Sequence, residues 1–353
     1  MRIFRPVIIN AQSVVMNLQY KKVLDDMWRL HEQSRSSNAP TIISTFAGCG
    51  GSSLGYSMAG YKELLMIEWD ANAVSTFKKN FNVPVFHGDI NKITGDDILK
   101  KTGLKRGELY LLDGSPPCQG FSTSGNRDPN DPRNMLFTGF SRLLKELSPK
   151  VFVMENVAGM VRGRMKRNFR VILRHLKQCG YQVKAWLLNA KNYMVPQSRE
   201  RLIFIGIRND LDITPSCPDK KASCIVTVKN ALDGVVNKHY SSLGTNSKTL
   251  AVAKMVKPGQ AGCSVKKDSY FNLKRIHNQK PSNTIPKSSG GLFHPIKDRP
   301  LTIEECKRIG SFPDQFKFIG SFREQWNRIG NSVPPLFMKA IAEHILNLVP
   351  ADV

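Results

Sequence analysis

The sequence predicts an α/β fold in which a doubly wound sheet carries a smaller second domain. From residue 41 to residue 207, short apolar runs alternate with amphipathic stretches, the rhythm of parallel strands joined by crossover helices. The rhythm fails between residues 208 and 285, a span too long for one structureless loop inside a compact domain. The total of 353 residues also exceeds the usual size of a single domain.

Each part of the chain has its own expected elements. Strands of the main domain, residues 41–207, are expected at residues 41–46, 63–68, 109–112, 151–154, 181–189 and 201–207, and helices at residues 71–81 and 135–147. Residues 1–40 are expected to lie outside the core as an extension with one helix, at about residues 17–32. Residues 286–353 are expected to return to the main domain, with helical patterns at residues 301–309 and 336–348.

The charge of the chain favours a polyanionic partner. Lysine and arginine total 52 against 28 aspartates and glutamates, which gives a net charge of +24 and points to nucleic acid. Seven scattered cysteines, without the spacing of a zinc site, are typical of a reduced intracellular protein without a metal. No stretch approaches the roughly 18 to 20 apolar residues that cross a bilayer, so we expect a soluble cytosolic or nuclear protein with no membrane partner.

The first candidate site is the glycine-rich segment TFAGCGGSSLGY at residues 45–56, directly after a predicted strand. Gly48 and Gly50 permit a tight turn and close approach of a ligand to the backbone. Glu68 follows at the end of the next predicted strand, where a carboxylate can accept hydrogen bonds from both ribose hydroxyls. The segment therefore predicts an adenosine-containing cofactor, with a plain structural turn as the alternative. Ser53 stands where the dinucleotide pattern has its third glycine, which disfavours a nicotinamide cofactor.

The second candidate site is the segment DGSPPCQGFS at residues 113–122, which also follows a predicted strand. Open α/β sheets place their sites at this carboxyl edge. Two prolines fix the backbone ahead of Cys118 and leave it little freedom to move. A rigid thiol at a sheet edge indicates a nucleophile, whereas most single cysteines are small buried hydrophobic residues.

A basic run follows the predicted strand at residues 151–154. Its side chains either hold phosphates of a nucleic acid or form a solvated helix face. The run consists of Arg162, Arg164, Lys166, Arg167, Arg170 and Arg174.

Together these segments resemble the DNA cytosine-C5 methyltransferase family. The match continues in the family's order with ENV at residues 155–157, QSRER at 197–201, RPLT at 299–302, FPD at 312–314 and GNSVPP at 330–335. The resemblance covers most of residues 41–345. It implies a Rossmann-like methyltransferase sheet with residues 208–285 as a target recognition domain. The implied reaction transfers a methyl group from S-adenosylmethionine to C5 of cytosine in a short double-stranded DNA sequence.

The resemblance also implies roles for individual residues. Cys118 adds to C6 of a cytosine that is flipped out of the duplex, which makes C5 enamine-like. Glu155 holds the base at N3 and N4, and Arg199 and Arg201 lie near the base and the thiol. The implied cofactor contacts are Phe46, Gly48, Gly50, Glu68, Trp69, Asp89, Ile90, Pro116, Leu136, Asn331 and Val333.

The chain departs from the family pattern at Ser44 and Thr45, where Asp-Leu is more common, and at Ile309, where Gln is common. Three alternatives stay open: a tRNA cytosine-C5 methyltransferase, whose Cys-Phe-Thr tripeptide is absent here, a catalytically silent DNA-binding homologue, and a Rossmann-type oxidoreductase. We expect a monomeric cytoplasmic enzyme of bacterial or phage type, associated with the nucleoid through DNA. A restriction endonuclease of the same system is considered as a further functional partner, without a stable complex.

Overall fold

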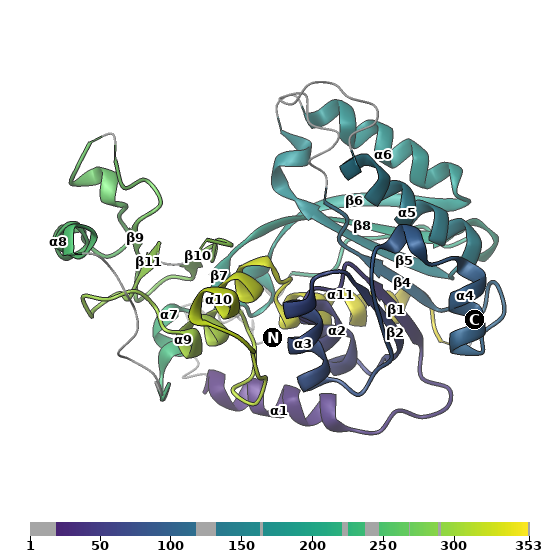
Figure 1. Cartoon of the computed structure of the whole chain (residues 1–353), viewed down its shortest axis with the longest axis horizontal. Helices are drawn as coiled ribbons and strands as arrows, with labels where there is room; N and C mark the ends of the chain where they lie inside the picture. Colours follow the sequence, from purple (N-terminus) through teal and green to yellow (C-terminus); the bar gives the residue numbers. More distant parts are fainter. Residues whose placement is uncertain are drawn as a thin grey trace, which may run out of the picture.

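The centre of the molecule is a seven-stranded sheet with the order β3-β2-β1-β4-β5-β8-β6 (Figure 1). The computed structural model describes residues 19–117, 132–162, 165–220, 225–236, 247–267, 269–288 and 291–351. The strands of the sheet are β1 (Thr41–Thr45), β2 (Lys62–Glu68), β3 (Val85–His87), β4 (Leu111–Gly114), β5 (Val151–Val157), β6 (Tyr181–Asn189) and β8 (Glu200–Arg208). The α/β class that the sequence predicts is confirmed.

One half of the sheet differs from the predicted parallel arrangement. The pairs among β1 to β5 are parallel, but β8 lies between β5 and β6 and runs antiparallel to both. The expectation of parallel strands was therefore wrong for β8. The reason is the connection from β6 to β8, residues 190–199, because a parallel crossover needs about a dozen residues or more.

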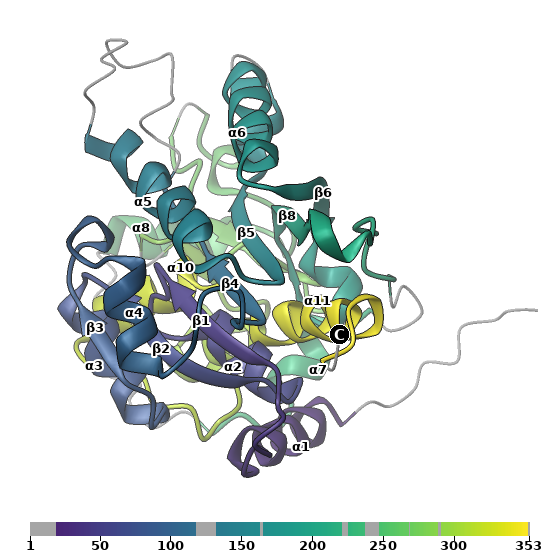
Figure 2. The ribbon, with the colours of Figure 1, turned by 90° about the vertical axis from the view of Figure 1, so that its right-hand side faces the viewer.

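Helices cover both faces of the sheet (Figures 1 and 2). One face carries α1 (Tyr20–Glu32), α2 (Gly51–Met58), α3 (Ala71–Asn80) and α11 (Pro335–Leu348), and the other carries α4 (Gly95–Thr102), α5 (Pro132–Leu147) and α6 (Lys166–Gln178). Successive strand residues point to opposite faces, so Ile42 belongs to the first core cluster and Ile43 to the second. Within the described ranges, no helix has both the length and the apolar character needed to span a membrane.

The N-terminal helix α1 belongs to the core, which corrects the expectation that residues 1–40 lie outside it. Tyr20 and Leu24 are buried in the same cluster as the apolar face of α2, and α1 contacts both α2 and α7 (Val228–Leu232). Partly buried Met27 and Trp28 extend the same stripe at the spacing of a helix face. The physical reason for the burial is this apolar stripe, which the sequence already contains.

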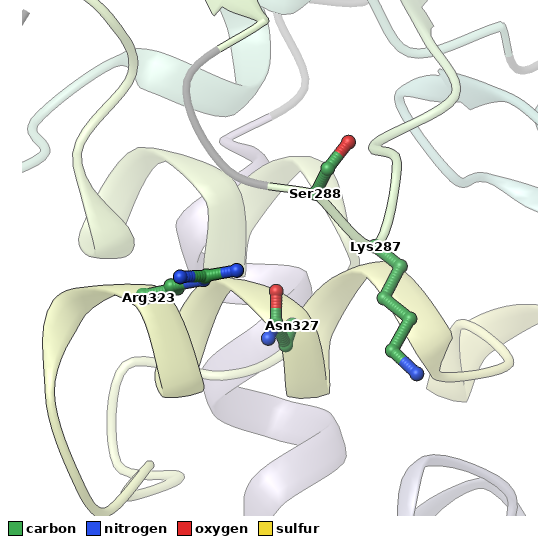
Figure 3. A pocket seen from close by; sticks show the side chains of 4 residues that line it. All are labelled: Lys287, Ser288, Arg323 and Asn327. Carbon is green, nitrogen blue, oxygen red and sulfur yellow. The ribbon is translucent and has the colours of Figure 1, made fainter.

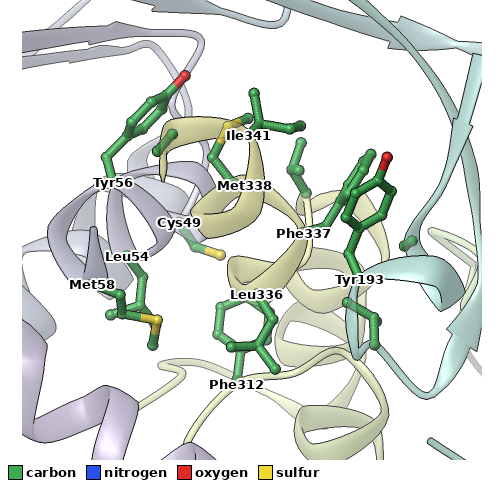
Figure 4. Packing of buried hydrophobic residues seen from close by; sticks show 14 of the residues in the cluster. Cys49, Leu54, Tyr56, Met58, Tyr193, Phe312, Leu336, Phe337, Met338 and Ile341 are labelled. Atoms are coloured by element: carbon green, nitrogen blue, oxygen red, sulfur yellow. The ribbon is translucent and has the colours of Figure 1, made fainter. Parts of the chain in front are cut away.

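The C-terminal helix α11 packs directly on α2, close to the segment that follows β1 (Figure 4). The two helices lie so close that a Cβ on Gly55 would stand 2.6 Å from the carbonyl oxygen of Pro335. Tyr61 donates its hydroxyl to the carbonyl of Ala342 at 3.0 Å, and Tyr110 donates to the carbonyl of Val349. The last helix is thereby tied to the first strands of the sheet.

A smaller part of the chain has its own apolar cluster, formed by Val252, Ala253, Val256, Leu273 and Phe293. Its elements are α8 (Ser247–Met255), β9 (Lys274–Arg275) and β11 (Leu292–Phe293), with β9 and β11 paired. By contrast, β10 (Ser282–Asn283) pairs with β7 (Gln197–Ser198), and α7 packs on α9 (Ile303–Ile309) of the main core. Residue 285, the predicted boundary, therefore does not separate the two parts cleanly. The elements α7 and β10 precede it but contact the main core, and β11 follows it but belongs to the smaller part.

A buried acidic network lies under the carboxyl edge of the sheet. Asp113, at the end of β4, accepts a hydrogen bond of 3.1 Å from the Tyr56 hydroxyl, and its backbone carbonyl accepts one from Thr45. Burial raises the pKa of Asp113 to about 8, and nearby Glu63 adds to this rise. Burial likewise raises the pKa of Glu63 to about 7, although Ser44 and Ser53 stabilise its charged form. Both carboxyls therefore hold a proton in the folded state over a range in which the unfolded chain has lost it.

This network predicts that stability decreases as pH rises from about 4 to about 8. Between these values the folded state binds more protons than the unfolded state, so the free energy of unfolding falls by up to about 1.4 kcal/mol per pH unit for each proton. We expect Asp113→Asn to flatten this slope, since the amide side chain cannot ionise and still accepts a hydrogen bond from Tyr56. Urea titrations between pH 5 and 9 measure how the free energy of unfolding changes with pH.

The control is Asp96→Asn, which removes an exposed carboxylate from α4. This variant should keep the wild-type slope. Identical slopes for Asp113→Asn and the wild type would contradict the assignment of the proton to Asp113.

Candidate active site

The candidate residues gather at one edge of the sheet, where the parallel strands β1, β2, β4 and β5 all end. The glycine loop, defined as residues 46–51, follows β1, and Glu68 is the last residue of β2. Pro116 follows β4, and Glu155 lies near the end of β5. The two candidate segments, which are well separated in the sequence, are thus neighbours in space.

The Glu68 side chain holds the glycine loop by hydrogen bonds to backbone amides. Its Oε2 accepts the backbone amide of Gly48 at 2.8 Å, and its Oε1 accepts the amides of Trp69 and Asp70 at 2.9 Å each. Gly48 and Gly50 have φ values of +58° and +93°, and Phe46 has +52°, an uncommon value for a residue with a side chain. The buried carboxylate therefore sets the shape of the loop by holding its backbone.

Trp69, which follows Glu68, and the turn at residues 88–89 lie beside the end of β2. Trp69 is 76% exposed, so its ring is not part of the core. Asp89 caps the short helix η1 (Ile90–Lys92) by accepting the Asn91 amide at 2.9 Å, while Ile90 is buried. Gly88 donates its amide to the carbonyl of Glu68 at 3.0 Å, which holds this turn beside β2.

The motif at residues 330–335 contacts the glycine loop, although the two are far apart in the sequence. The Cys49 thiol lies 3.1 Å from the Ser332 hydroxyl, between exposed Asn331 and buried Val333. A second link joins Arg328 of α10 (Phe322–Asn331) to Asp70, the N-cap of α3, at 2.9 Å. Asn331 and Val333 are thereby brought to the same edge as Glu68.

Glu155 and Arg201 form an ion pair at the ends of β5 and β8. Arg201 Nε lies 2.6 Å from Glu155 Oε1, and the side chains are only 15% and 12% exposed. The antiparallel register explains the contact, since Glu155 pairs with Ile203 and Val157 pairs with Arg201, which makes the two side chains diagonal neighbours. Arg201 Nη1 also donates to the backbone carbonyl of Glu200 at 2.8 Å.

Arg199 is a buried cation. It is 2% exposed as a residue, its Nη1 donates to the carbonyl of Ile285 at 3.5 Å, and its Nε has no partner among the described residues. Burial, and to a smaller extent nearby Arg201, lower the pKa of Arg199 to about 9, while Glu155 opposes this shift. Arg199 therefore adds positive potential behind Glu155.

The segment before Cys118 is anchored to β5. Asn156 Nδ2 donates to the carbonyl of Pro116 at 3.0 Å, and both residues are buried. Cys118 itself lies in residues 118–131, outside the described part of the chain. Leu136, in α5 beyond that gap, is partly buried against the second core cluster. The anchored carbonyl stands two residues before the predicted nucleophile.

A separate pocket of about 620 Å³ lies where the segment before residue 289 crosses α10 (Figure 3). Lys287, Ser288, Arg323 and Asn327 line it. The side-chain amide of Asn327 donates to the carbonyls of Arg323 and Lys287. Two cations and no carboxylate therefore border this pocket.

Three residues that organise the site were not assigned a role from the sequence. Asn156 lies within the motif at residues 155–157, and only its contact with Pro116 shows what it does. Asp70 has a recognisable N-cap position before α3, but nothing in the sequence identifies its partner Arg328, 258 residues away. Long-range partners of this kind are visible only in the folded chain.

The doubly wound sheet, the glycine loop held by a strand-end glutamate and the Glu155–Arg201 pair at the same edge define an enzyme of the Rossmann-like α/β class. A model of the family described as C-5 cytosine-specific DNA methylase matches residues 40–347. The chain therefore belongs to the C-5 cytosine-specific DNA methylase family, and it is a cytosine-C5 DNA methyltransferase.

Curated relatives match over most of their length. The Type II methyltransferase M1.HphI of Haemophilus parahaemolyticus is 32% identical over 327 residues, which are 87% of this chain and 87% of that protein. The Type II methyltransferase M.DdeI of Desulfomicrobium norvegicum is 33% identical, over 86% of this chain and 88% of that protein.

Solved structures share the fold. A DNA modification methyltransferase encoded within an Escherichia coli prophage superposes with a TM-score of 0.74 at 24% identity, covering 88% of this chain and 99% of its own. The Dnmt2 methyltransferase of S. pombe gives a TM-score of 0.64 at 17% identity, covering 88% and 98%.

Gly50→Ala should disrupt the glycine loop. At φ +93° a Cβ on Gly50 would lie 2.5 Å from Phe81 Cε2 and 2.8 Å from Phe77 Cδ2, and these two rings are themselves stacked. We expect a loss of about 2–4 kcal/mol in the free energy of unfolding from backbone strain and overpacking together. Urea denaturation measures this loss.

Gly60→Ala is the matched control, because Gly60 has the same φ of +93° and nothing within 4 Å of its Cβ position. It should lose only the backbone term, about 1–2 kcal/mol. Equal losses in the two variants would show that the loop tolerates a Cβ against the phenylalanine rings.

Proposed function

We propose that this enzyme transfers a methyl group from S-adenosylmethionine to C5 of cytosine in a specific short double-stranded DNA sequence. The observation that carries the proposal is the meeting, at one sheet edge, of the Glu68-held glycine loop with the Glu155–Arg201 pair. The same edge holds the Pro116 carbonyl that precedes Cys118. A cofactor, a base and a thiol therefore have adjoining places.

The residues at this edge fit an adenosine-containing cofactor. Glu68 Oε2 accepts one described hydrogen bond, so it retains capacity for a ribose hydroxyl. The exposed Trp69 ring offers a stacking surface for adenine, and Asp89 and Ile90 supply a carboxylate and an apolar contact beside it. Phe46, Gly48, Gly50, Pro116, Leu136, Asn331 and Val333 complete the proposed cofactor contacts. When bound, S-adenosylmethionine supplies an electrophilic methyl group.

Glu155 is proposed to hold the target cytosine. A carboxylate fixed by Arg201 Nε at 2.6 Å cannot rotate freely, so its other oxygen has a defined direction. It can accept a hydrogen bond from N4 and stabilise a proton at N3, which draws electron density out of the ring. Arg199 and Arg201 add positive potential that favours a thiolate nearby.

Cys118 is proposed as the nucleophile. Its thiolate forms a bond to C6 and makes C5 enamine-like, so that C5 takes the methyl group. Loss of the C5 proton, followed by departure of the thiolate from C6, restores the aromatic ring and the free enzyme. The base must leave the duplex for this step, at a cost of a few kcal/mol. Asn156 positions the loop by holding the carbonyl of Pro116.

Double-stranded DNA is favoured over tRNA as the substrate. The curated relatives named above are Type II methyltransferases of bacteria, while the likeness to a Dnmt2 structure at 17% identity concerns the fold. The smaller part of the chain around α8, β9 and β11 is proposed to read the target bases, as the target recognition domain predicted at residues 208–285. We further propose that the enzyme acts as a monomer in the bacterial cytoplasm, alongside a restriction endonuclease of the same system.

Cys118→Ala should abolish methyl transfer and leave cofactor binding intact, since the alanine side chain lacks only the attacking sulfur. The measurement is transfer of labelled methyl from S-adenosylmethionine to unmethylated duplex DNA and to unmodified tRNA, followed by conversion sequencing. Calorimetric titration of the cofactor shows whether the variant remains folded and competent to bind.

Cys179→Ala is the control, because it removes a half-buried thiol from the end of α6 and should keep full activity. Substantial transfer by Cys118→Ala would refute the nucleophile assignment. Label on tRNA alone would make the enzyme a tRNA methyltransferase, and no label on either would indicate a silent DNA-binding homologue.

A further inference from the structure

The outward surface of α6 carries several cations and no acidic residue of its own. Between Glu155 and Glu200 the chain has no aspartate or glutamate. The exposed face of α6 presents Lys166, Arg167, Arg170, Arg174 and Lys177, which we call the α6 cationic face. None of the five forms an ion pair with a carboxylate in the part of the chain that the structure describes.

The helices α1 and α5 pair surface cations with carboxylates of the same helix. In α1, Lys21 pairs with Asp25 at 2.5 Å, and Arg29 pairs with Asp26 at 2.9 Å. In α5, Arg142 pairs with Glu146 at 2.8 Å, one helical turn away. The α6 cationic face instead repeats like charges at spacings of three and four residues, which destabilises an isolated helix. Lys166 and Arg167 also stand in its first turn, against the positive end of the helix dipole.

The position of α6 connects this face to the active site. The helix begins shortly after β5, the strand of Glu155, and the short helix η3 (Ala158–Val161) lies between them. Arg162, at the junction, pairs with Glu200 at 2.7 Å, next to Arg201. Figure 1 shows α6 and the smaller part with α8 and β9 on opposite sides of the molecule. The α6 cationic face therefore starts near the candidate site and extends from it on the side opposite the smaller part.

We propose that the α6 cationic face binds the phosphate backbone of DNA that flanks the target sequence. This inference rests on the proposed function, because the target cytosine sets where the flanking DNA lies. From Lys166 to Lys177 the helix spans about 16 Å at 1.5 Å per residue, which equals roughly five base pairs along one strand. The interaction gives affinity without reading bases, since phosphates carry no sequence information.

An anionic membrane is the other partner that a cationic helix can suit, and the composition of α6 argues against it. Its apolar residues Ile172 and Leu176 are buried against the protein, and Phe169 and Leu173 pack beside them. Val171, 46% exposed, is the single large apolar side chain on the outward face. An interfacial helix needs an apolar face to insert into lipid, and this helix has already buried its own.

The test uses the quadruple variant Arg167→Gln, Arg170→Gln, Arg174→Gln and Lys177→Gln in the full chain. Its affinity for a long duplex is compared with that for a short duplex that ends beside the target, by fluorescence anisotropy over a range of salt. For the long duplex, we expect the slope of log K against log salt to become shallower by about 0.9 for each phosphate that the variant no longer neutralises. Affinity for the short duplex and methyl transfer at saturating DNA should stay at wild-type values.

The matched control removes four exposed cations from the end of α4 and the segment that follows it, at Lys100, Lys101, Lys105 and Arg106, each changed to Gln. It lowers the net charge equally and should leave both the salt slope and the preference for the long duplex near wild type. An equal loss in both variants would overturn the proposal, because net charge alone would then explain the effect. Equal weakening for short and long duplexes would overturn it too.

Two further measurements separate the alternatives. Binding of the wild type, but not of the α6 variant, to phosphatidylserine vesicles, with DNA affinity unchanged, would assign the face to a membrane and overturn the proposal. A thermal melt checks folding, and the double variant Arg170→Gln, Arg174→Gln replaces the quadruple if that one unfolds. If the wild type transfers no methyl group to DNA, the proposed function fails, while a length-dependent loss of DNA affinity in the variant still supports the role of α6.

Discussion

The site depends first on the Glu68 carboxylate, which holds three backbone amides from two different strand ends. Without it, the loop after β1 would have no fixed relation to β2, since Gly48 and Gly50 have little conformational preference of their own and the positive φ of Phe46 is uncommon for a residue with a side chain. Asp70 extends the same arrangement by pairing with Arg328, which brings α10 and then Asn331 to the loop. A single buried carboxylate thus sets the geometry of a surface built from distant parts of the chain.

The Glu155–Arg201 pair fixes the site at the ends of β5 and β8 in a similar way, because each side chain restricts the rotamers of the other.

Much of the fold could be predicted from the sequence because buried parallel strands have a strong apolar signal. The strand at residues 181–189 has the predicted bounds, and those of β1 and β2 lie within one residue of the prediction. The strands β3, β7, β9, β10 and β11 are two or three residues long, too short to show a period, and none was predicted. The direction of β8 also escaped prediction, since an apolar run does not indicate which way a strand points. The direction of β8 is indicated only by the ten-residue connection after β6, which is too short for a parallel crossover.

The candidate site was less visible than the fold. Glu68, Glu155 and the glycine loop could be found because each lies at the end of a predicted strand, and such positions share an edge. Their supporting contacts could not be found, since Asn156 to Pro116 and Arg328 to Asp70 join residues 40 and 258 positions apart. The environment of α1 was also predicted wrongly, although its apolar stripe at Tyr20 and Leu24 indicates a buried helix face. Amphipathic patterns show that a face is buried, but they do not name the surface that buries it.

The packing of α11 on α2 has a consequence for how the protein is made. The apolar face of α2 emerges from the ribosome well before its partners Leu336, Phe337, Met338 and Ile341, which follow it at a long distance in the sequence. During translation, at roughly 5 to 20 residues per second, that face waits for tens of seconds without the helix that covers it. Folding of the cofactor edge therefore finishes only after synthesis of α11, and a nascent chain stalled in the smaller part presents an uncovered apolar surface to chaperones and proteases.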